Sequence, residues 1–361
     1  MTENAYIHIP FCKSKCFYCV FTSFSSLKSR DEYIFALKKE IGKFYKGEEL
    51  RTLYFGGGTP SLLTVEQIKS ILELFKVKEH AEITLEANPD GIDINYLKGI
   101  KDIGINRISF GSQTFNDKLL KDIGRTHCAK DIKIAVKNAK TAGFENISVD
   151  LIYGLPSQSI EDFSKDLDKV IDLEIEHVSL YGLKIDEGCV FAVKPPKNLP
   201  NADMQADMIL LAIKKLKDAG FEHYEVSNFS KKSFESKHNL NYWNNNTYYG
   251  FGLSSSGYEN GIRYKNEINL KKYIENPYKK LEEEKITKQQ KLEEEIFLGL
   301  RKLNGINFEE INSKFNIDFE KKYKNILTKY TKYLVKNGEF YHLTESGILI
   351  SNEIMSEFIE I

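Results

Sequence analysis

The sequence predicts an α/β fold built from six β/α units with parallel strands. Short apolar or β-branched stretches alternate with longer segments of helical periodicity from Tyr6 to about Leu180, and this alternation favours parallel strands joined by right-handed crossovers. The chain has 361 residues, enough for a large domain and a smaller one. We expect a core over residues 1–180, an extension over 181–285 and a C-terminal domain over 286–361.

The expected elements follow from length and periodicity. The strands are Tyr6–Pro10, Thr52–Phe55, Glu82–Ala87, Arg107–Phe110, Asn146–Asp150 and His177–Leu180. The helices between them are Asp31–Phe44, Val65–Phe75, Ala129–Ala142 and Ile160–Asp172. Sites of parallel β/α barrels gather at the C-terminal ends of the strands. Residues that follow these strands are therefore the candidates for function.

Charge and hydropathy argue against two classes of partner. The net charge is −1, which implies no general affinity for nucleic acid or for an anionic membrane. The mean hydropathy is −0.40, and no apolar run approaches the roughly 18 residues that span a bilayer. The N-terminus resembles no signal peptide, so we expect a cytoplasmic protein whose thiols are reduced.

Three cysteines cluster in the loop that leaves the first predicted strand. Cys12, Cys16 and Cys19 have the spacing C-x3-C-x2-C. Soft thiolates select iron–sulfur clusters, zinc or copper(I). A cluster of four irons held by three thiolates keeps one iron open for another ligand. The odd number of cysteines disfavours a disulfide framework, whereas a zinc site completed by His8 and a set of inert buried thiols both stay open.

This cysteine spacing after a first strand, with the aromatic Tyr18 directly before the third cysteine, resembles the radical S-adenosylmethionine (SAM) superfamily. The resemblance implies a partial (β/α)6 barrel and a [4Fe-4S] cluster on the three cysteines. It also implies that the amino and carboxylate groups of SAM chelate the open iron. An electron from the cluster then splits SAM to a 5′-deoxyadenosyl radical.

A glycine-rich segment, Gly56-Gly57-Gly58-Thr59-Pro60, follows the second predicted strand. Glycines let a backbone approach a ligand and offer it polar groups, although such a segment also forms ordinary tight turns. In this position it resembles the GGTP segment of the superfamily, which holds the amino group of SAM. Gly57, Gly58 and Thr59 are therefore candidate SAM-binding residues.

Four polar residues are expected at the same rim. Glu86 ends the third predicted strand, Gln113 follows the fourth, Asp150 closes the fifth, and Arg125 lies in Gly124-Arg125-Thr126-His127. Singly each is an ordinary polar residue, but together they suit a ligand with an ammonium, a carboxylate and ribose hydroxyls. Because arginine binds carboxylates in a bidentate manner, we assign Arg125 to the methionine carboxylate of SAM. Asp150 and Gln113 suit the ribose, and Glu86 suits another polar group.

Three further residues complete the expected SAM site. Tyr18 is placed to flank the adenine, and Tyr6 lies one layer behind the cluster. Gly182 follows the sixth predicted strand. His127 is interpreted as a polar residue at a helix start.

A second motif follows a predicted helix, Asp203–Ala219, and a predicted strand, Tyr224–Phe229. It is His238-Asn239-Leu240-Asn241-Tyr242-Trp243, which contains the only tryptophan. One interpretation is a half-buried aromatic turn with a hydrogen-bonded histidine. The other is an axial histidine for heme iron, flanked by aromatic rings that pack on the porphyrin.

With this run, HNxxYW, the chain resembles the HemW family, which are heme chaperones related to oxygen-independent coproporphyrinogen III oxidase. The resemblance covers most of the chain and assigns His238, Asn239, Tyr242 and Trp243 to heme. Val20 stands where the family usually has aspartate. Phe21 stands where the oxidases have a further cysteine, which favours the chaperone branch, as does the short N-terminus.

The C-terminal region begins with a predicted helix, Lys291–Leu303, whose apolar residues recur on one face. It resembles a small, mostly helical winged-helix-like module. Such modules often bind DNA, but the net charge argues against a nucleic-acid partner, and we expect a lid or a partner-docking role.

Two classes of function stay open on the sequence. The first is a carrier that holds a [4Fe-4S] cluster, SAM and heme and delivers heme to apo-hemoproteins such as respiratory cytochromes. The second is a radical SAM enzyme that acts on a porphyrinogen, as an oxygen-independent coproporphyrinogen III dehydrogenase, or that opens heme. The resemblance also suggests a flavodoxin-like electron donor, a homodimer formed with heme, and peripheral contact with the membrane during heme transfer.

Overall fold

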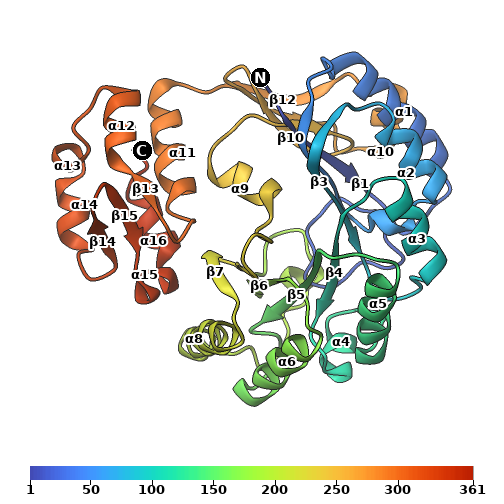
Figure 1. Cartoon of the computed structure of the whole chain (residues 1–361), viewed down its shortest axis with the longest axis horizontal. Helices are drawn as coiled ribbons and strands as arrows, with labels where there is room; N and C mark the ends of the chain where they lie inside the picture. The colour runs from blue at the N-terminus through green and yellow to red at the C-terminus, as the bar shows by residue number, and fades with distance from the viewer. Residues whose placement is uncertain (361) are drawn as a thin grey trace.

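A nine-stranded sheet forms the centre of the molecule (Figure 1), with the strand order β7-β8-β6-β5-β4-β3-β2-β1-β9. The computed structural model describes residues 1–360. Strands β1 to β6 are parallel and lie side by side in chain order, which confirms the predicted six β/α units. Because β7 and β9 are the two edges of the sheet, the barrel is open. The parallel strands are β1 Asn4–Ile9, β2 Leu50–Gly57, β3 Val77–Ala87, β4 Arg107–Gln113, β5 Ile147–Tyr153 and β6 His177–Gly182.

Helices α1 to α6 lie along the outside of this sheet (Figure 1). All four predicted helices are present, and capping boxes begin α2 at Thr64 and α6 at Ser159. Two short helices, α3 and α4, were not predicted, although Asp93 and Asn116 cap them with their side chains. The helices are α1 Arg30–Phe44, η1 Pro60–Leu62, α2 Val65–Leu72, α3 Ile94–Asp102, α4 Asp117–Asp122, α5 Ala129–Thr141 and α6 Ile160–Asp172.

Side chains alternate along the parallel strands, so that one set packs under the helices and the other faces the barrel interior. Ala5, Ile7 and Ile9 of β1 are fully buried in the main apolar core. Tyr6 and His8, which alternate with them, join a polar interior network through a hydrogen bond of 3.1 Å. The interior of this barrel is therefore polar, as expected for a ligand site rather than a packed core.

The extension beyond β6 adds strands to both edges of the sheet. The predicted single strand over 224–229 is wrong: the chain reverses at Val226, and β7 and β8 pair antiparallel. Strand β9 pairs parallel with β1, and a separate antiparallel sheet has the order β10-β11-β12. The elements are α7 Val190–Val193, α8 Ala202–Asp218, β7 Glu222–Glu225, β8 Asn228–Ser230, α9 Lys237–Trp243, β9 Tyr249–Phe251, β10 Ser256–Glu259, β11 Ile262–Asn266, α10 Leu270–Glu275 and β12 Lys280–Lys285.

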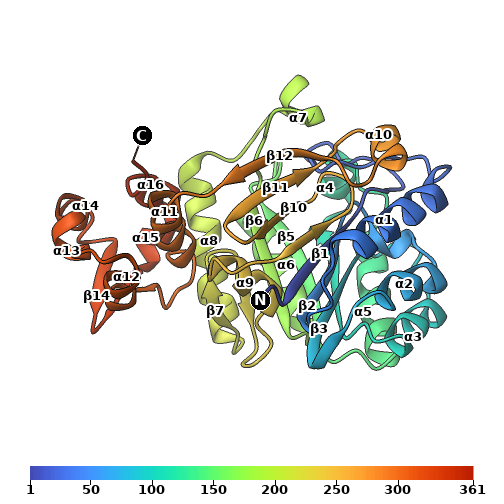
Figure 2. The same cartoon turned by 90° about the horizontal axis from the view of Figure 1, so that it is seen from above.

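The C-terminal region packs beside the barrel around its own apolar core (Figure 2). Six helices and a three-stranded sheet of order β13-β15-β14 form the mostly helical, winged-helix-like module that was predicted. No helix in residues 1–360 is both long enough and apolar enough to cross a membrane. The elements are α11 Lys288–Gly299, β13 Ile306–Asn307, α12 Phe308–Phe315, α13 Phe319–Lys322, α14 Lys324–Lys329, β14 Leu334–Asn337, β15 Phe340–Leu343, α15 Glu345–Leu349 and α16 Ser351–Ser356.

Candidate functional site

Backbone hydrogen bonds hold the loop that carries the three cysteines, both at its base and near its tip. It connects β1 to α1, at the C-terminal end of β1. At the base, the Phe24 N–H donates to the Pro10 carbonyl at 2.8 Å, and the Cys12 N–H donates to the Phe24 carbonyl at 3.0 Å. Near the tip, the Phe17 N–H donates to the Ile123 carbonyl at 3.0 Å. The loop is therefore held at the rim of the barrel where sites of this architecture form.

Two of the cysteine sulfurs have polar partners from other parts of the chain, one after β2 and one between α4 and α5. The Thr59 hydroxyl lies 3.6 Å from Cys12 Sγ, and Arg125 Nη1 lies 3.4 Å from Cys16 Sγ. The thiolate is the form of cysteine that binds metal. Burial raises the pKa of Cys19, and the neighbouring thiols of Cys16 and Cys12 raise it further. The three thiols therefore lie close enough to interact electrostatically.

The donor set fits an iron–sulfur cluster better than a zinc ion. Within residues 1–360 no group of three or more His, Cys, Asp or Glu side chains surrounds a single metal position. Cluster ligands need no such convergence, because each thiolate binds a different iron. His8, the predicted alternative zinc ligand, already pairs with the Tyr6 hydroxyl at 3.1 Å and the Thr22 carbonyl at 2.9 Å. Both of its ring nitrogens are thus engaged inside the protein.

The glycine-rich segment packs against the base of the cysteine loop. A Cβ on Gly58 would lie 2.5 Å from the Phe11 carbonyl oxygen, and Gly57 has φ +112. The Gly58 N–H donates to the Ile9 carbonyl at 2.9 Å, and the Thr59 N–H to the Phe11 carbonyl at 2.7 Å. Because these N–H groups are engaged, the backbone groups that this segment can offer a ligand are carbonyl oxygens. Carbonyl oxygens can accept hydrogen bonds from an ammonium group.

Two carboxylates face the barrel interior below the loop. Glu86 accepts hydrogen bonds from the Tyr54 hydroxyl at 2.8 Å and from the Gly57 N–H at 3.1 Å. Burial raises the pKa of Glu86 to about 7, with a further contribution from Asp150. Asp150 accepts from the Ser109 hydroxyl at 3.0 Å, and burial raises its pKa as well. Two half-buried carboxylates in one interior favour a ligand with positive charge and hydroxyl donors.

Arg125 links the cysteine loop to the ends of β3 and β4. Its Nη2 donates to Asn88 Oδ1 at 2.7 Å and to the Gly111 carbonyl. A Cβ on Gly111 would lie 3.0 Å from Gln113 Nε2 and 3.5 Å from Arg125 Nη2. Gln113 adopts a left-handed backbone with φ +68, which turns the chain at the end of β4. Arg125, Gln113 and Asn88 therefore converge beside Cys16, as the predicted rim requires.

Of the other predicted SAM residues, Tyr18 and Gly182 lie near this rim, whereas Tyr6 lies deeper in the barrel, on the side of His238. Tyr18 packs against an apolar cluster that includes Leu119 and Ile123. Tyr6 stacks on Tyr54 with ring centres 6.0 Å apart. At the end of β6, a Cβ on Gly182 would lie 3.1 Å from the Tyr153 hydroxyl.

His127 is a buried structural residue rather than a ligand of the rim. Its Nε2 lies 3.1 Å from the Ser112 carbonyl. Burial, aided by Arg125, lowers the pKa of His127 to about 4. The imidazole of His127 is therefore neutral near pH 7.

The sequence prediction missed three residues of the site. Asn88 bonds to both Arg125 and Thr59, and it directly follows the predicted strand that ends near Glu86. Tyr54 binds Glu86, and Arg107 is almost completely buried in the interior. A charged residue that begins a strand whose next residues are mostly apolar is a signal that could have identified Arg107, because an uncompensated charge is rarely buried.

The HNxxYW run is a helix, not the turn that was one expectation, and it closes the N-terminal end of the barrel. Its hydrogen bonds form a chain into the strands: Asn4 Nδ2 donates to Asn241 Oδ1 at 2.7 Å, and the Thr52 hydroxyl donates to Asn4 Oδ1 at 2.9 Å. His238 Nδ1 lies 2.7 Å from the same Thr52 hydroxyl, so this nitrogen carries the proton. His238 Nε2 then accepts from the Tyr242 hydroxyl at 2.8 Å.

His238 is consequently not open to a ligand in this structure. It is 1% exposed, and burial lowers its pKa to about 3. Glu82 accepts from the backbone N–H groups of Lys237 and His238, both at 3.0 Å, and holds the start of α9 in place. The predicted role of His238 as an axial ligand of heme iron conflicts with this arrangement. Its Nε2 could bind iron only after the hydrogen bond from the Tyr242 hydroxyl is broken.

The remaining members of the run lie on α9 or at its end. The Asn239 N–H donates to the Ser236 hydroxyl at 3.3 Å. The guanidinium of Arg301 lies 4.5 Å from the centre of the Trp243 ring, a cation–π contact that joins α9 to the C-terminal module. Trp243 thus has a structural contact of its own.

The family of the chain follows from its similarity to known proteins. Residues 6–170 match the model of the Radical SAM superfamily, and residues 286–350 match that of the HemN C-terminal domain. The chain is 41% identical to the protein named heme chaperone HemW of Lactococcus lactis subsp. lactis (strain IL1403), over 99% of this chain and 97% of that protein. The chain belongs to the HemW family. Its identity to heme chaperone HemW of Bacillus subtilis (strain 168) is 38%, over 99% of both.

The fold of this HemW family member also resembles a solved structure. Coproporphyrinogen III oxidase (HemN) from Escherichia coli superposes with a TM-score of 0.88, at 23% identity, over 99% of this chain and 90% of that one. At this identity the likeness establishes the fold alone. The region matched to the radical SAM superfamily contains the cysteine loop and the rim as far as Asp150, whereas the HNxxYW run lies between the two matched regions.

Proposed function

We propose that this chain is a radical SAM heme chaperone that binds heme and delivers it to apo-hemoproteins. Its similarity to proteins named heme chaperone HemW, over nearly the whole of both chains, carries this proposal. Within the chain, Cys12, Cys16 and Cys19 would hold a [4Fe-4S] cluster. SAM bound to such a cluster supplies 5′-deoxyadenosyl radical chemistry.

The rim residues would bind SAM through complementary charge. Arg125 would exchange its bond to Asn88 or Gly111 for the methionine carboxylate. Carbonyl oxygens of the Gly57 and Gly58 segment would accept from the amino group, with Thr59 beside them. These roles use groups that already converge next to Cys16.

The remaining rim groups would position the nucleoside part. Asp150 and Gln113 would bind the ribose hydroxyls, and Glu86 would neutralise positive charge in the interior. Tyr18 would flank the adenine, with Tyr6 below and Gly182 leaving space at the end of β6. The raised pKa of Glu86 and Asp150 supports this proposal, because a cationic ligand would recover the cost of their burial.

We propose heme binding from membership of the family, and we assign no residue as ligand of the heme iron. The residues to test are His238, Asn239, Tyr242 and Trp243. In the described arrangement His238 offers no axial ligand, because its Nε2 accepts a hydrogen bond from the Tyr242 hydroxyl. We also propose a cytoplasmic location with peripheral membrane contact during transfer, a flavodoxin-like electron donor, and a homodimer with heme.

The three-part division at residues 180 and 285 is part of the same proposal. Separate apolar cores in the barrel and in the C-terminal module support the second boundary. The module would dock the acceptor or cover the bound cofactor.

An anaerobic optical time course tests the function. Reconstituted protein is mixed with heme, SAM and a reductant, and the Soret band is followed. A Soret band that persists, followed by transfer of the heme to an added apo-cytochrome, supports the carrier function. Decay of the band with release of 5′-deoxyadenosine would instead favour an enzyme that opens heme, and oxidation of coproporphyrinogen III without heme binding would favour the dehydrogenase.

Cysteine variants provide the matched control for the cluster. Cys16→Ala should lose iron and sulfide after reconstitution, because two thiolates do not retain the cluster. Cys128→Ala, at the N-cap of α5 and outside the C-x3-C-x2-C motif, should keep both. Full iron content in Cys16→Ala would contradict the assignment of the ligands.

A further inference from the structure

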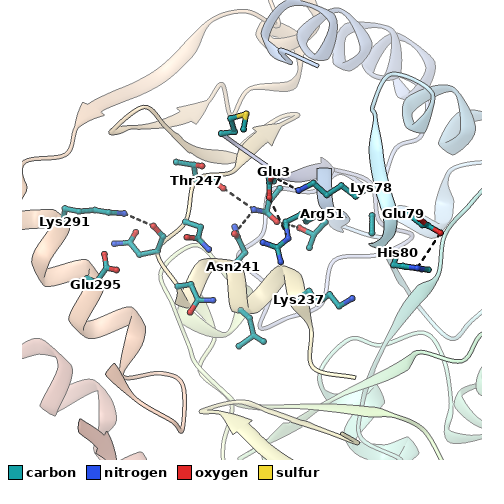
Figure 3. A pocket seen from close by; sticks show the side chains of 18 of the residues that line it. Glu3, Arg51, Lys78, Glu79, His80, Lys237, Asn241, Thr247, Lys291 and Glu295 are labelled. Atoms are coloured by element: carbon teal, nitrogen blue, oxygen red, sulfur yellow. Dashed lines mark hydrogen bonds and ion pairs between the residues drawn. The ribbon is translucent and has the colours of Figure 1, made fainter. Parts of the chain in front are cut away.

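A cavity of about 750 Å³ lies at the N-terminal ends of the strands, and the cysteine loop follows the C-terminal end of β1. Figure 3 shows side chains that line this cavity. Its walls are the N-terminal ends of β1, β2 and β3, one face of α9, and helices α11 and α12 of the C-terminal module. Asn4, Thr52 and Lys78 come from the strands, Asn241 from α9, and Lys291 from α11. The cavity therefore joins the barrel, the extension and the C-terminal module at one place.

The cavity wall carries an excess of positive charge. Five Lys or Arg and three Glu side chains line it. Glu3 pairs with Lys78 at 2.6 Å, and Glu295 pairs with Lys314 at 2.8 Å. Lys237 and Lys291 have no carboxylate partner within 4.0 Å among residues 1–360.

Lys291 is a half-buried cation of the cavity wall, and its ammonium lies 4.5 Å from the centre of the Tyr258 ring. Its ammonium donates to the Asn245 carbonyl at 2.7 Å. Burial lowers the pKa of Lys291 to about 8, and the nearby cation Lys314 contributes, although Glu295 acts in the opposite direction. A half-buried ammonium in contact with a backbone carbonyl and close to a second cation is stabilised by any anion that enters the cavity.

Two buried amides in the wall add donors that lack acceptors. Asn241 and Asn245 are 5% and 7% exposed, and the Nδ2 of each has no hydrogen-bond partner among the described residues. The orientation of Asn241 is set by Asn4, which donates to its Oδ1 at 2.7 Å. Buried amide donors are normally paired, so an acceptor oxygen in or beside the cavity would complete both.

We propose that this cavity binds a small oxyanion, one that carries phosphate or carboxylate groups. Both groups present only acceptor oxygens at neutral pH, which match the ammonium groups of Lys237 and Lys291 and the amides of Asn241 and Asn245. An uncharged apolar ligand has nothing to pair with these donors. A bound oxyanion would contact α9 and α11 together and so hold the C-terminal module against the barrel.

The site is separate from the cluster and from the proposed SAM site, because it lies at the other ends of the strands. The proposal does not depend on heme transfer, and its failure leaves the proposed function untouched. The reverse is also true, since a full chain without heme activity can still bind an oxyanion here.

Calorimetry on the full-length, reconstituted protein tests the proposal. Inorganic pyrophosphate and citrate are titrated separately at constant ionic strength. Saturable binding of either one supports the site, and the tighter of the two identifies the phosphate or the carboxylate as its ligand chemistry. Absence of saturable binding for both probes would overturn it.

Charge variants locate the binding. Lys291→Met and Lys237→Met should each weaken the affinity roughly tenfold or more, because each removes a charge-assisted hydrogen bond. Lys288→Met is the matched control, since Lys288 is exposed on the same helix α11 and does not line the cavity. Lys237 is exposed on α9, so its replacement should not disturb the fold. Equal affinity in all three variants would mean nonspecific ion binding and would refute the proposal.

Discussion

Replacement of Glu86 by glutamine should make the protein more stable above pH 7 and should weaken SAM binding. Glu86 is a largely buried carboxylate that accepts two hydrogen bonds, from the Tyr54 hydroxyl and from the Gly57 N–H. Glutamine has the same shape and can keep both contacts, because its oxygen accepts from Gly57 and the Tyr54 hydroxyl can rotate to accept from its amide. The substitution therefore removes charge with little change in packing.

The magnitude follows from the pKa of Glu86, which burial raises from 4.5 to about 7. Below pH 4.5 the carboxyl is protonated in both the folded and the unfolded state, so burying it carries no ionisation penalty and the folded protein has its full stability. Between pH 4.5 and 7 the unfolded chain releases the proton first, and stability falls as the pH rises. Because glutamine stays neutral, the stability advantage of the variant over the native protein should grow by about 2–3 kcal/mol from pH 5 to pH 8.

The assay is urea unfolding of the reduced protein without the cluster, at pH 5 and pH 8. Trp243 is the only tryptophan, and its fluorescence reports the release of α9. Glu32→Gln is the control, because Glu32 is exposed on α1 and its replacement removes the same charge at the surface. Calorimetry on the reconstituted protein then compares SAM affinity, which should fall roughly tenfold if the carboxylate faces positive charge on the ligand.

Two results would refute this reasoning. If Glu86→Gln differed from the native protein equally at pH 5 and pH 8, the carboxylate would not carry a burial penalty. If the variant gained stability but bound SAM as tightly as the native protein, Glu86 would be a strained structural residue and not part of the ligand site.

Four other substitutions test the packing, the hydrogen bonds of His238 and the rim. Gly58→Ala should destabilise the protein by about 2–3 kcal/mol, because its Cβ would lie 2.5 Å from a backbone carbonyl oxygen that cannot move freely. Gly42→Ala, which meets nothing within 4 Å on α1, should stabilise it by about 0.5–1 kcal/mol in the same thermal unfolding assay. Thr52→Val should cost about 1–3 kcal/mol, since it leaves His238 Nδ1 and an asparagine oxygen unpaired in the interior, and an unchanged melting temperature would disprove the chain of hydrogen bonds. Arg125→Lys should reduce SAM affinity roughly tenfold, because lysine cannot form a bidentate contact, and unchanged affinity by calorimetry would rule out the carboxylate role.

Much of the fold could be predicted because its signals are local. The six strands and four of their helices show alternating or helical periodicity, and both depend only on neighbouring residues. The two-strand turn at Val226 was missed, because a reversal inside a short polar stretch has no periodicity of its own. Strand β9 was missed for a similar reason: only its parallel pairing with β1, far away in the chain, makes it a strand.

The candidate site divides in the same way. The cysteine spacing and the polar residues at strand ends were visible, because parallel strands bring their C-terminal ends to one rim. The contacts of those residues were not visible. Arg125 reaches Cys16 across 109 positions of the chain, and nothing in either segment indicates the other.

By itself, the sequence determined the six-unit α/β core, the position of the cysteine loop and most of the polar rim, because each follows from spacing along one segment and from strand direction. Only the tertiary structure decided how the HNxxYW helix is used. His238 meets Thr52 across 186 positions, and this contact encloses its ring and occupies Nδ1. The same packing of α9 against the strands and α11 creates the basic cavity. Such contacts depend on register and on which faces meet, and these are properties of the whole fold.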